Sequence, residues 1–199
     1  MVETDEELVS AFRGGDISAF DTLVQRWERK IQGAVYRIMG SGEEARDLAQ
    51  ETFLRAYRGL GSFKSEARFS SWLYQIALNL CRDRLRQRRG KTLVSIDDLD
   101  PTTAARIDRS PATAQDIVEA KDLGRIVALA MADLPEEQRE VITLKEYQGL
   151  TFQEIADLIG CPLSTVKTRL YQGLTVLRRE LAKADALGVK RSVNLKSEK

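Results

Sequence analysis

Apolar residues recur at steps of three and four along most of the chain, and this spacing constrains the fold more than any other feature. One face of an α-helix repeats about every 3.6 residues, so the spacing predicts amphipathic helices. The glycine-containing segments at 14–16 and 40–42 separate three such helices within residues 1–60, and a fourth begins near residue 70. Within residues 5–40 the recurring positions are Leu8, Phe12, Phe20, Leu23, Val24, Trp27, Ile31, Val35 and Ile38.

The helical spacing stops in the segment 92–114, where Pro101 and Pro111 lie among Ser, Thr and Asp residues. Polar segments that contain proline are typical of linkers, and loops of this length are uncommon inside a compact domain. Helical spacing returns near residue 117 and continues to about residue 181. The sequence therefore predicts an all-α fold of two helical domains, 1–91 and 115–183, joined by a flexible linker at 92–114 and followed by a tail at 184–199.

The composition excludes several classes of protein. The 199 residues contain no histidine, and the two cysteines, Cys81 and Cys161, lie outside any CxxC pattern. The commonest general base and metal ligand are thus absent, and no glycine-rich phosphate-binding motif occurs. We therefore expect a protein that is not an enzyme and has no metal site or cofactor. For Cys81 two readings stay open: nearby arginines would activate the thiol, whereas burial would make it inert.

The chain shows no signal for a membrane. No segment approaches the roughly 20 consecutive apolar residues that a transmembrane helix needs. The N-terminal residues MVETDEELVS are acidic, where a signal peptide would be basic and then apolar. We therefore expect a cytoplasmic protein with no membrane segment of its own.

Charge is segregated along the chain although the net charge is only +1. Residues 82–91 contain six basic residues and one acid, whereas residues 92–122 are mainly acidic. Segregation of this kind predicts a polyanion-binding face beside an acidic connector.

The strongest local pattern predicts a helix-turn-helix near the end of the chain. Thr151 and Glu154 form a T-x-x-E capping box, Gly160 permits a sharp turn, and Pro162 suits the first turn of a second helix. The polar face of that second helix would fit the major groove of DNA. The alternative is an ordinary helical hairpin with a solvated polar face. The outward residues are Ser164, Lys167, Thr168, Tyr171, Gln172 and Thr175, with Arg169 towards the core flank and suited to a phosphate or intrahelical contact.

A second pattern places aromatic residues directly before a run of arginines, within residues 62–90. Unpaired bases stack on aromatic rings while their phosphates pair with positive charge, so this pattern favours single-stranded nucleic acid. The alternative is that the aromatic residues are core. Trp72 and Phe69 suit either role, whereas Leu73, Ile76, Ala77 and Leu80 share a core stripe. Asn79, Arg82, Arg86 and Arg89 share a polar face suited to a nucleic-acid backbone.

A third pattern lies on the helix predicted near residues 41–60. One of its faces combines a leucine with charges of both signs, which indicates a protein interface or, equally, plain solvation. The residues of this face are Asp47, Gln50, Glu51, Leu54, Arg55 and Arg58.

Taken together, residues 5–182 resemble the extracytoplasmic-function group of bacterial sigma factors, the minimal two-domain members of the sigma-70 family. The resemblance rests on three motifs: D-x-x-Q-E-x-F from Asp47, F-x-x-W-L-x-x-I-A-x-N from Phe69, and L-T-x-x-E-I-A from Leu150 with T-V-K-x-R after it. Such proteins bind core RNA polymerase, read the minus-thirty-five promoter element and melt the minus-ten element. The resemblance also implies an anti-sigma factor as a partner.

The resemblance assigns a role to each of the three faces. The polymerase-binding residues would be Asp47, Gln50, Glu51, Leu54, Arg55 and Arg58. The minus-ten residues, which would hold the unpaired non-template strand, are Phe63, Lys64, Phe69, Ser71, Trp72, Asn79, Arg82, Arg86 and Arg89. The residues that would read duplex DNA at the minus-thirty-five element are Ser164, Thr165, Lys167, Thr168, Arg169, Tyr171, Gln172 and Arg178.

The chain departs from the family pattern on the base-reading face. Ser164 stands where a glycine is frequent, and Gln172-Gly173 replaces a frequent Arg-Ala pair. The promoter sequence therefore cannot be transferred from relatives. Two other functions stay open at this point: a helix-turn-helix repressor or activator that binds DNA unaided, and a purely protein-binding helical module.

Overall fold

The computed structural model of the protein describes residues 3–40, 42–63, 68–96 and 121–186. Within these ranges the chain is helical and forms no strand, which confirms the predicted all-α class. Most of the predicted linker and tail, and Lys64, lie outside the described residues. The exact domain boundaries therefore stay predictions.

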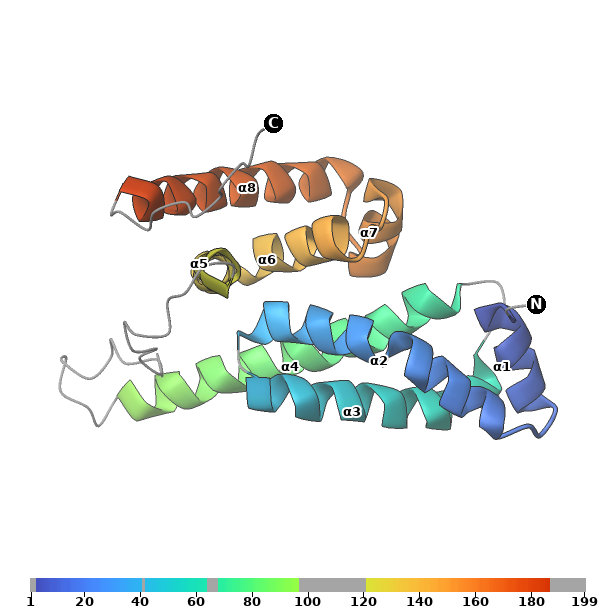
Figure 1. Ribbon diagram of the computed structural model, residues 1–199. Coiled ribbons are helices and arrows are strands. Elements are labelled where there is room, and N and C mark those ends of the chain that lie inside the picture. The colour runs from blue at the N-terminus through green and yellow to red at the C-terminus, as the bar shows by residue number, and fades with distance from the viewer. Residues whose placement is uncertain (1–2, 41, 64–67, 97–120, 187–199) are drawn as a thin grey trace, which may run out of the picture.

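Within the described residues, the first domain contains four α-helices and one short 3-10 turn. They are α1 (Asp5–Arg13), α2 (Ser18–Met39), α3 (Gly42–Gly59), the turn η1 (Leu60–Ser62) and α4 (Phe69–Ile96). The predicted breaks are present, because Gly15 and Gly40 adopt positive φ values of 104° and 69° between successive helices. The long helices α2, α3 and α4 pack side by side (Figure 1). Their core contains the fully buried side chains of Leu23, Ile31, Leu60, Phe69, Leu73 and Leu78.

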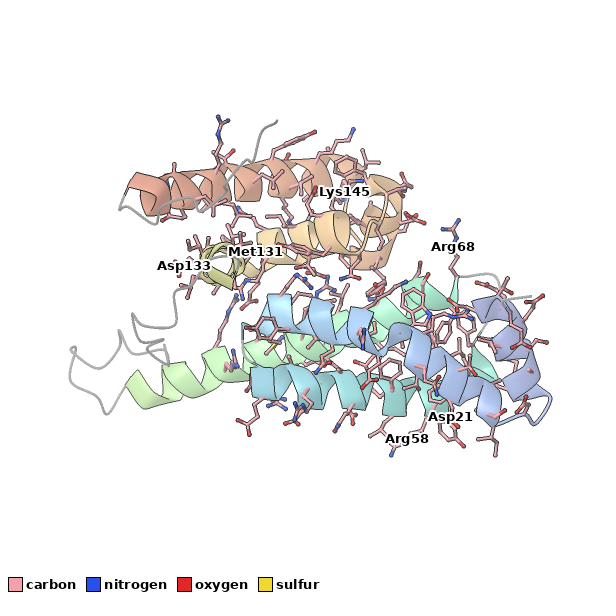
Figure 2. All side chains as sticks on the ribbon, in the orientation of Figure 1. Asp21, Arg58, Arg68, Met131, Asp133 and Lys145 are labelled. Carbon is pink, nitrogen blue, oxygen red and sulfur yellow. The ribbon has the colours of Figure 1, made fainter. Side chains whose placement is uncertain are left out.

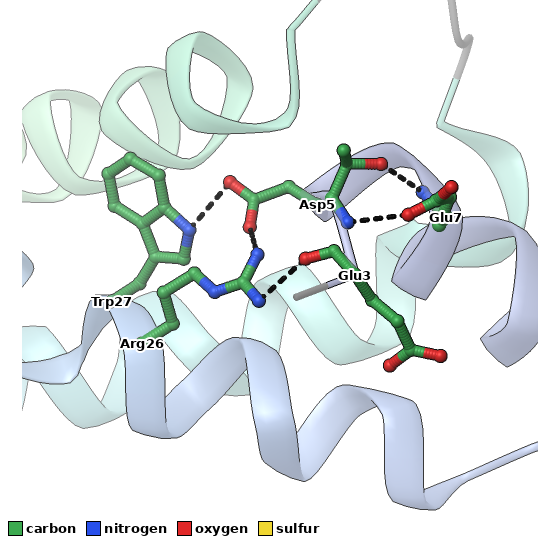
Figure 3. A network of polar contacts seen from close by, with 6 residues as sticks. Glu3, Asp5, Glu7, Arg26 and Trp27 are labelled. Atoms are coloured by element: carbon green, nitrogen blue, oxygen red, sulfur yellow. Dashed lines mark hydrogen bonds and ion pairs between the residues drawn. The ribbon is translucent and has the colours of Figure 1, made fainter. Parts of the chain in front are cut away.

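A polar network fixes the N-terminal helix α1 on α2 (Figure 3). Thr4 and Glu7 form a capping box that starts α1. Asp5 in the first turn pairs with Arg26 at 2.5 Å and accepts a 2.9 Å hydrogen bond from the indole N–H of Trp27. One carboxylate thus orients two side chains of α2, and α1 is tied to the domain by charge as well as by packing.

The second domain contains the predicted helix-turn-helix. Its elements are α5 (Lys121–Ala132), α6 (Glu136–Ile142), the π-helical turn η2 (Thr143–Tyr147), α7 (Phe152–Ile159) and α8 (Leu163–Ala186). The capping box is formed as predicted: the Thr151 hydroxyl accepts from the Glu154 N–H at 3.2 Å, and the Glu154 carboxylate accepts from the Thr151 N–H at 2.8 Å. Gly160 ends α7 in the left-handed conformation at φ 68° and makes the turn into α8.

Gly173, for which the sequence offered no account, lies where α8 crosses α6. A Cβ at this position would stand 2.6 Å from Cδ1 of Ile142 and 3.2 Å from Cβ of Gln138. Ile142 is itself almost fully buried, so it has little room to move aside. The glycine therefore permits the close approach of the two helices, which offsets its poor helix propensity.

The two domains lie against each other in the described structure. Helices α5, α6 and α7 lie against α2 or α4, α8 lies on the outer side of the second domain, and α3 lies on the opposite side of the first domain (Figure 1). Arg139 of α6 is buried and donates 2.8 Å hydrogen bonds to the carbonyls of Ala132 and Leu134 in its own domain. It also donates a 2.7 Å hydrogen bond to the Ile38 carbonyl at the end of α2. One guanidinium thus satisfies carbonyl groups of both domains.

The crossing at Gly173 generates a prediction about stability. We expect Gly173→Leu to lower the free energy of unfolding by about 1–3 kcal/mol, because the added side chain overpacks the contact with Ile142. The measurement is urea unfolding followed by circular dichroism. Thr175→Leu is the matched control, because Thr175 is exposed on the same helix. Equal stability of Gly173→Leu and the control would contradict the close-approach argument.

The structure also decides between the two readings of Cys81. Cys81 is buried, and burial, reinforced by Glu140, raises the pKa of its thiol to about 12 despite the opposing effect of Arg82. Because the thiolate is the reactive form, we expect a maleimide at pH 7.5 to modify only the partly exposed Cys161 in the native protein. Mass spectrometry should show one adduct in the folded chain and two in urea. A second rapid adduct in the folded chain would contradict this.

Candidate nucleic-acid interface

The polar face of α8 is exposed as the sequence predicted. Ser164, Lys167, Thr168, Tyr171, Gln172, Thr175 and Arg178 are all exposed, and Thr165 is half-buried. Tyr171 presents 61% of its surface although it is a large aromatic residue. The opposite face of α8 is anchored by the buried side chains of Val166, Leu170 and Leu177. The helix thus offers a continuous row of hydrogen-bonding groups to a ligand.

Local contacts hold parts of this face in place. The Thr168 hydroxyl donates to the Ser164 carbonyl at 2.9 Å, and the Thr175 hydroxyl donates to the Tyr171 carbonyl at 2.8 Å. With both hydroxyls bonded to the backbone, the methyl groups of these exposed threonines suit an apolar contact with a thymine methyl. Arg169 is half-buried on the flank of α8, as predicted, and its Nη1 lies 4.0 Å from Sγ of Cys161.

Lys145 extends the basic character of the helix-turn-helix beyond the predicted residues. Its ammonium lies 4.8 Å from the centre of the Phe152 ring, and the ammonium of Lys167 lies 5.7 Å from the same ring. Lys145 also donates to the Leu150 carbonyl at 3.1 Å. The two cations therefore flank the start of α7. Lys145 could not be placed there from the sequence, because the π-helical turn η2 brings it beside α7.

The aromatic residues before the arginine run are mostly core. Phe63 and Phe69 are buried, as in the alternative in which these aromatic residues belong to the core. The ring of Phe63 packs against that of Phe69, and its centre lies 4.8 Å from the centre of the half-buried Trp72 ring. The ring of Phe69 also contacts that of Trp27 in α2. The physical reason is that α2 supplies an aromatic partner which the local sequence does not reveal. Trp72 and the half-buried Ser71 retain partial exposure.

The polar face of α4 is formed as predicted, but two of its arginines are already paired with the second domain. Arg82 binds Glu140 through Nη2 at 2.5 Å and Nε at 3.4 Å, and Arg89 binds Glu136 at 2.8 Å. Arg86 is 80% exposed and lies 3.7 Å from Asp83 on its own helix. The remaining polar residue, Asn79, is exposed and accepts a 3.3 Å hydrogen bond from Gln75.

Of the two glutamates of α6 that pair with α4, Glu140 is the more deeply buried, with 6% of its surface exposed. Burial raises its pKa, and the neighbouring Arg82 acts in the opposite direction. Glu136 and Glu140 could not be identified from the sequence, because their partners lie in the other domain.

The third predicted face is exposed on α3. Asp47, Gln50, Arg55 and Arg58 are exposed, Glu51 is half-buried, and Leu54 presents 51% of its surface. Glu51 and Arg55 form an ion pair at 2.8 Å. Arg58 projects from α3 on the side away from the second domain (Figure 2). A groove of about 400 Å³ beside this face is lined by Asp47, Leu48, Glu51, Arg55, Leu80, Asp83, Arg84 and Gln87.

Across the described ranges, no cluster of acidic residues or cysteines is arranged to hold a metal ion. Among the helices of these same ranges, none has the length and apolar character to cross a bilayer.

Comparison with known proteins finds two sigma-70 regions in the chain. Residues 23–91 match the family model for Sigma-70 region 2, and residues 124–177 match that for Sigma-70, region 4. The RNA polymerase sigma-H factor of Pseudomonas aeruginosa is 35% identical over 171 residues, which cover 82% of this chain and 86% of the relative. The ECF RNA polymerase sigma-E factor of Escherichia coli K12 is 34% identical over 167 residues, which cover 81% and 86%.

Solved structures share the fold. CnrH in complex with the cytosolic domain of CnrY matches with a TM-score of 0.66 and 26% identity over 92% of this chain and 99% of that one. The sigma factor RpoE from Bartonella quintana, in complex with the anti-sigma factor NepR, matches in fold with a TM-score of 0.65 at 20% identity, over 83% and 98%. With both sigma-70 regions present in order and relatives matched over most of their length, the chain belongs to the extracytoplasmic-function sigma factors of the sigma-70 family.

Proposed function

We propose that this sigma factor binds core RNA polymerase through α3, holds the unpaired non-template strand along α4, and reads the minus-thirty-five element with α8. The observation that carries the proposal is the presence of three chemically different surfaces on a chain with both sigma-70 regions. A repressor or activator that binds duplex DNA unaided would need only α7 and α8, so it leaves the first domain without a role.

The exposed face of α8 supports base reading in the major groove. Lys167 and Gln172 carry the groups that pair with guanine and adenine edges, and Tyr171 adds a hydroxyl and an apolar ring. Arg178 lies further along the same helix, where a contact with a phosphate would set the register. The flanking Lys145 suits a further backbone contact beside α7.

The α4 surface supports binding of a single strand. Arg82, Arg86 and Arg89 supply positive charge along one face, and Asn79 supplies an amide that can hydrogen-bond a base. Trp72 is the partly exposed aromatic residue near the start of this face, whereas the rings of the buried Phe63 and Phe69 pack against it. We therefore assign base stacking to Trp72 and a supporting role to the two phenylalanines.

The α3 surface has the character of a protein interface. Leu54 is an exposed apolar centre, and it is surrounded by the charged and amide groups of Asp47, Gln50, Arg55 and Arg58. An apolar centre with a polar rim is the usual anatomy of such surfaces. The partner that we propose for this surface is core RNA polymerase.

The solved structures similar to this chain support an anti-sigma factor as a second protein partner, because the protein NepR bound to RpoE is of that class. Since polymerase and promoter DNA are the other proposed partners, we place the protein in the cytoplasm. In this proposal the chain catalyses no reaction of its own, and the chemistry of transcription belongs to the polymerase.

A reconstitution tests the proposed function as a whole. We expect the purified chain, added to core RNA polymerase, to produce transcripts that start at a defined set of genomic promoters. The measurement is run-off transcription on a genomic library, with core polymerase alone as the control. Binding of the chain to free duplex DNA without any stimulation of initiation would refute the proposal and favour a repressor or activator.

A single substitution tests the assignment of α3. We expect Leu54→Arg to weaken association with core polymerase at least about tenfold, because it places a charge at the apolar centre of the interface. Leu129→Arg is the matched control, since Leu129 is a leucine of similar exposure on α5. Association is measured by biolayer interferometry, and circular dichroism checks the fold. Equal affinities of the two variants would overturn the assignment.

A further inference from the structure

A carboxylate in the first turn of α1 holds a buried tryptophan of α2. Oδ2 of Asp5 accepts the indole N–H of Trp27 at 2.9 Å, and Oδ1 of the same carboxylate pairs with Arg26 at 2.5 Å (Figure 3). The capping box that starts α1 fixes the backbone on which this carboxylate stands. Two different donors thus hold both oxygens of Asp5, so its position relative to Trp27 is well determined.

The indole of Trp27 depends on this acceptor for its orientation. Only 8% of the surface of Trp27 is exposed, and a buried indole N–H without an acceptor is unfavourable. The ring makes edge contacts with Phe69 and Tyr74, at centre-to-centre distances of 6.5 and 5.8 Å and interplanar angles of 69° and 87°. Such contacts depend on the angle between the rings. Loss of the acceptor would therefore favour a rotation of the indole that disturbs both contacts.

Phe69 connects Trp27 to the base-stacking residue. Phe69 is fully buried, and its ring centre lies 6.4 Å from that of Phe63 and 6.0 Å from that of Trp72. The rings of Phe63 and Trp72 are themselves 4.8 Å apart. Because protein interiors are close-packed, one ring of such a cluster cannot move far without displacing the next. The cluster forms a continuous row of aromatic contacts from α2 to the partly exposed Trp72.

The end of α3 limits the freedom of Trp72 further. A Cβ on Gly59 would stand 3.1 Å from Cζ2 and 3.5 Å from Cη2 of Trp72, so the six-membered ring lies close against the helix. Trp72 is therefore packed against Gly59, Phe63 and Phe69, and its remaining exposed surface is what a base can contact. A shift of Phe69 would change how much of this surface the base finds and at which angle.

We propose that Asp5 is a positioning residue for the capture of an unpaired base: its carboxylate orients Trp27, and Trp27 supports Trp72 through Phe69. The inference rests on the proposed function, which assigns base stacking to Trp72. Asp5 precedes residues 23–91, which match Sigma-70 region 2, and its charge is of the wrong sign for DNA. The N-terminal helix thus contributes to single-strand binding through the packing of aromatic rings, without a contact to the strand.

A purely structural role for Asp5 makes a different prediction. Loss of stability lowers the fraction of folded chain, which weakens the binding of every oligonucleotide by the same factor. Removal of a negative charge also acts through the phosphates, whether or not a base is present. A positioning role, by contrast, affects only the part of the affinity that comes from the stacked base. The ratio of affinities for an intact oligonucleotide and for the same oligonucleotide with one abasic site therefore isolates the proposed effect.

Fluorescence anisotropy of the full chain at fixed salt concentration measures this ratio. Abasic sites are first placed in turn along a single-stranded oligonucleotide, to find the position at which the missing base matters most. We expect the unmodified chain to prefer the intact strand about fivefold or more, and Asp5→Ala to lower this preference to about twofold or less. Circular dichroism checks that each variant is folded.

The matched control is Val9→Ala, which removes a buried core contact of the same helix and leaves the polar network intact. We expect Val9→Ala to lower the stability of the chain and to keep the full preference for the intact strand. Equal loss of preference in Val9→Ala and Asp5→Ala would reduce α1 to a structural role and overturn the proposal.

A double-variant cycle tests the hydrogen bond itself. Trp27→Phe keeps an aromatic ring beside Phe69 but removes the indole N–H that Asp5 accepts. We expect Trp27→Phe to lose the preference as Asp5→Ala does, and Asp5→Ala/Trp27→Phe to lose no more than either single variant, because all three lack the same bond. Losses that multiply in the double variant would show that the two residues act independently, contrary to the proposal.

Trp72→Ala separates this inference from the proposed function. If Trp72→Ala loses the preference for the intact strand while Asp5→Ala keeps it, the stacking role of Trp72 stands and the positioning role of Asp5 fails. If Trp72→Ala keeps the preference, or if the unmodified chain shows none, the stacking assignment in the proposed function fails and the inference fails with it.

Discussion

The ion pair between Arg82 and Glu140 is the contact on which the arrangement of the two domains depends. Glu140 is buried in the second domain, and a buried carboxylate needs a charged or hydrogen-bonding partner. Arg82 supplies that partner from α4, so the second domain must lie against α4 and the adjoining α2. The same placement leaves α3 on the outer side of the first domain and the polar face of α8 exposed. The buried Glu140 is thus satisfied only where the second domain lies against α4.

This arrangement gives the near-zero net charge a physical meaning. The chain carries 31 basic and 30 acidic residues, and a uniform mixture of them would bind DNA poorly. Instead, Arg82 and Arg89 of α4 pair with Glu140 and Glu136 of the second domain, whereas Arg84 pairs with Glu44 of α3. The charges of opposite sign therefore balance locally.

Local features of the sequence were sufficient for much of the fold. The capping box of Thr151 and Glu154 and the turn at Gly160 depend on neighbouring residues, and the structure confirms them together with the all-α class. Contacts between distant segments were not predictable. The burial of Phe69 depends on Trp27 of α2, the role of Gly173 depends on Ile142 of α6, and the pairing of Arg82 depends on a residue 58 positions away. Periodicity assigns a side chain to one face of a helix, but it does not say which element covers that face.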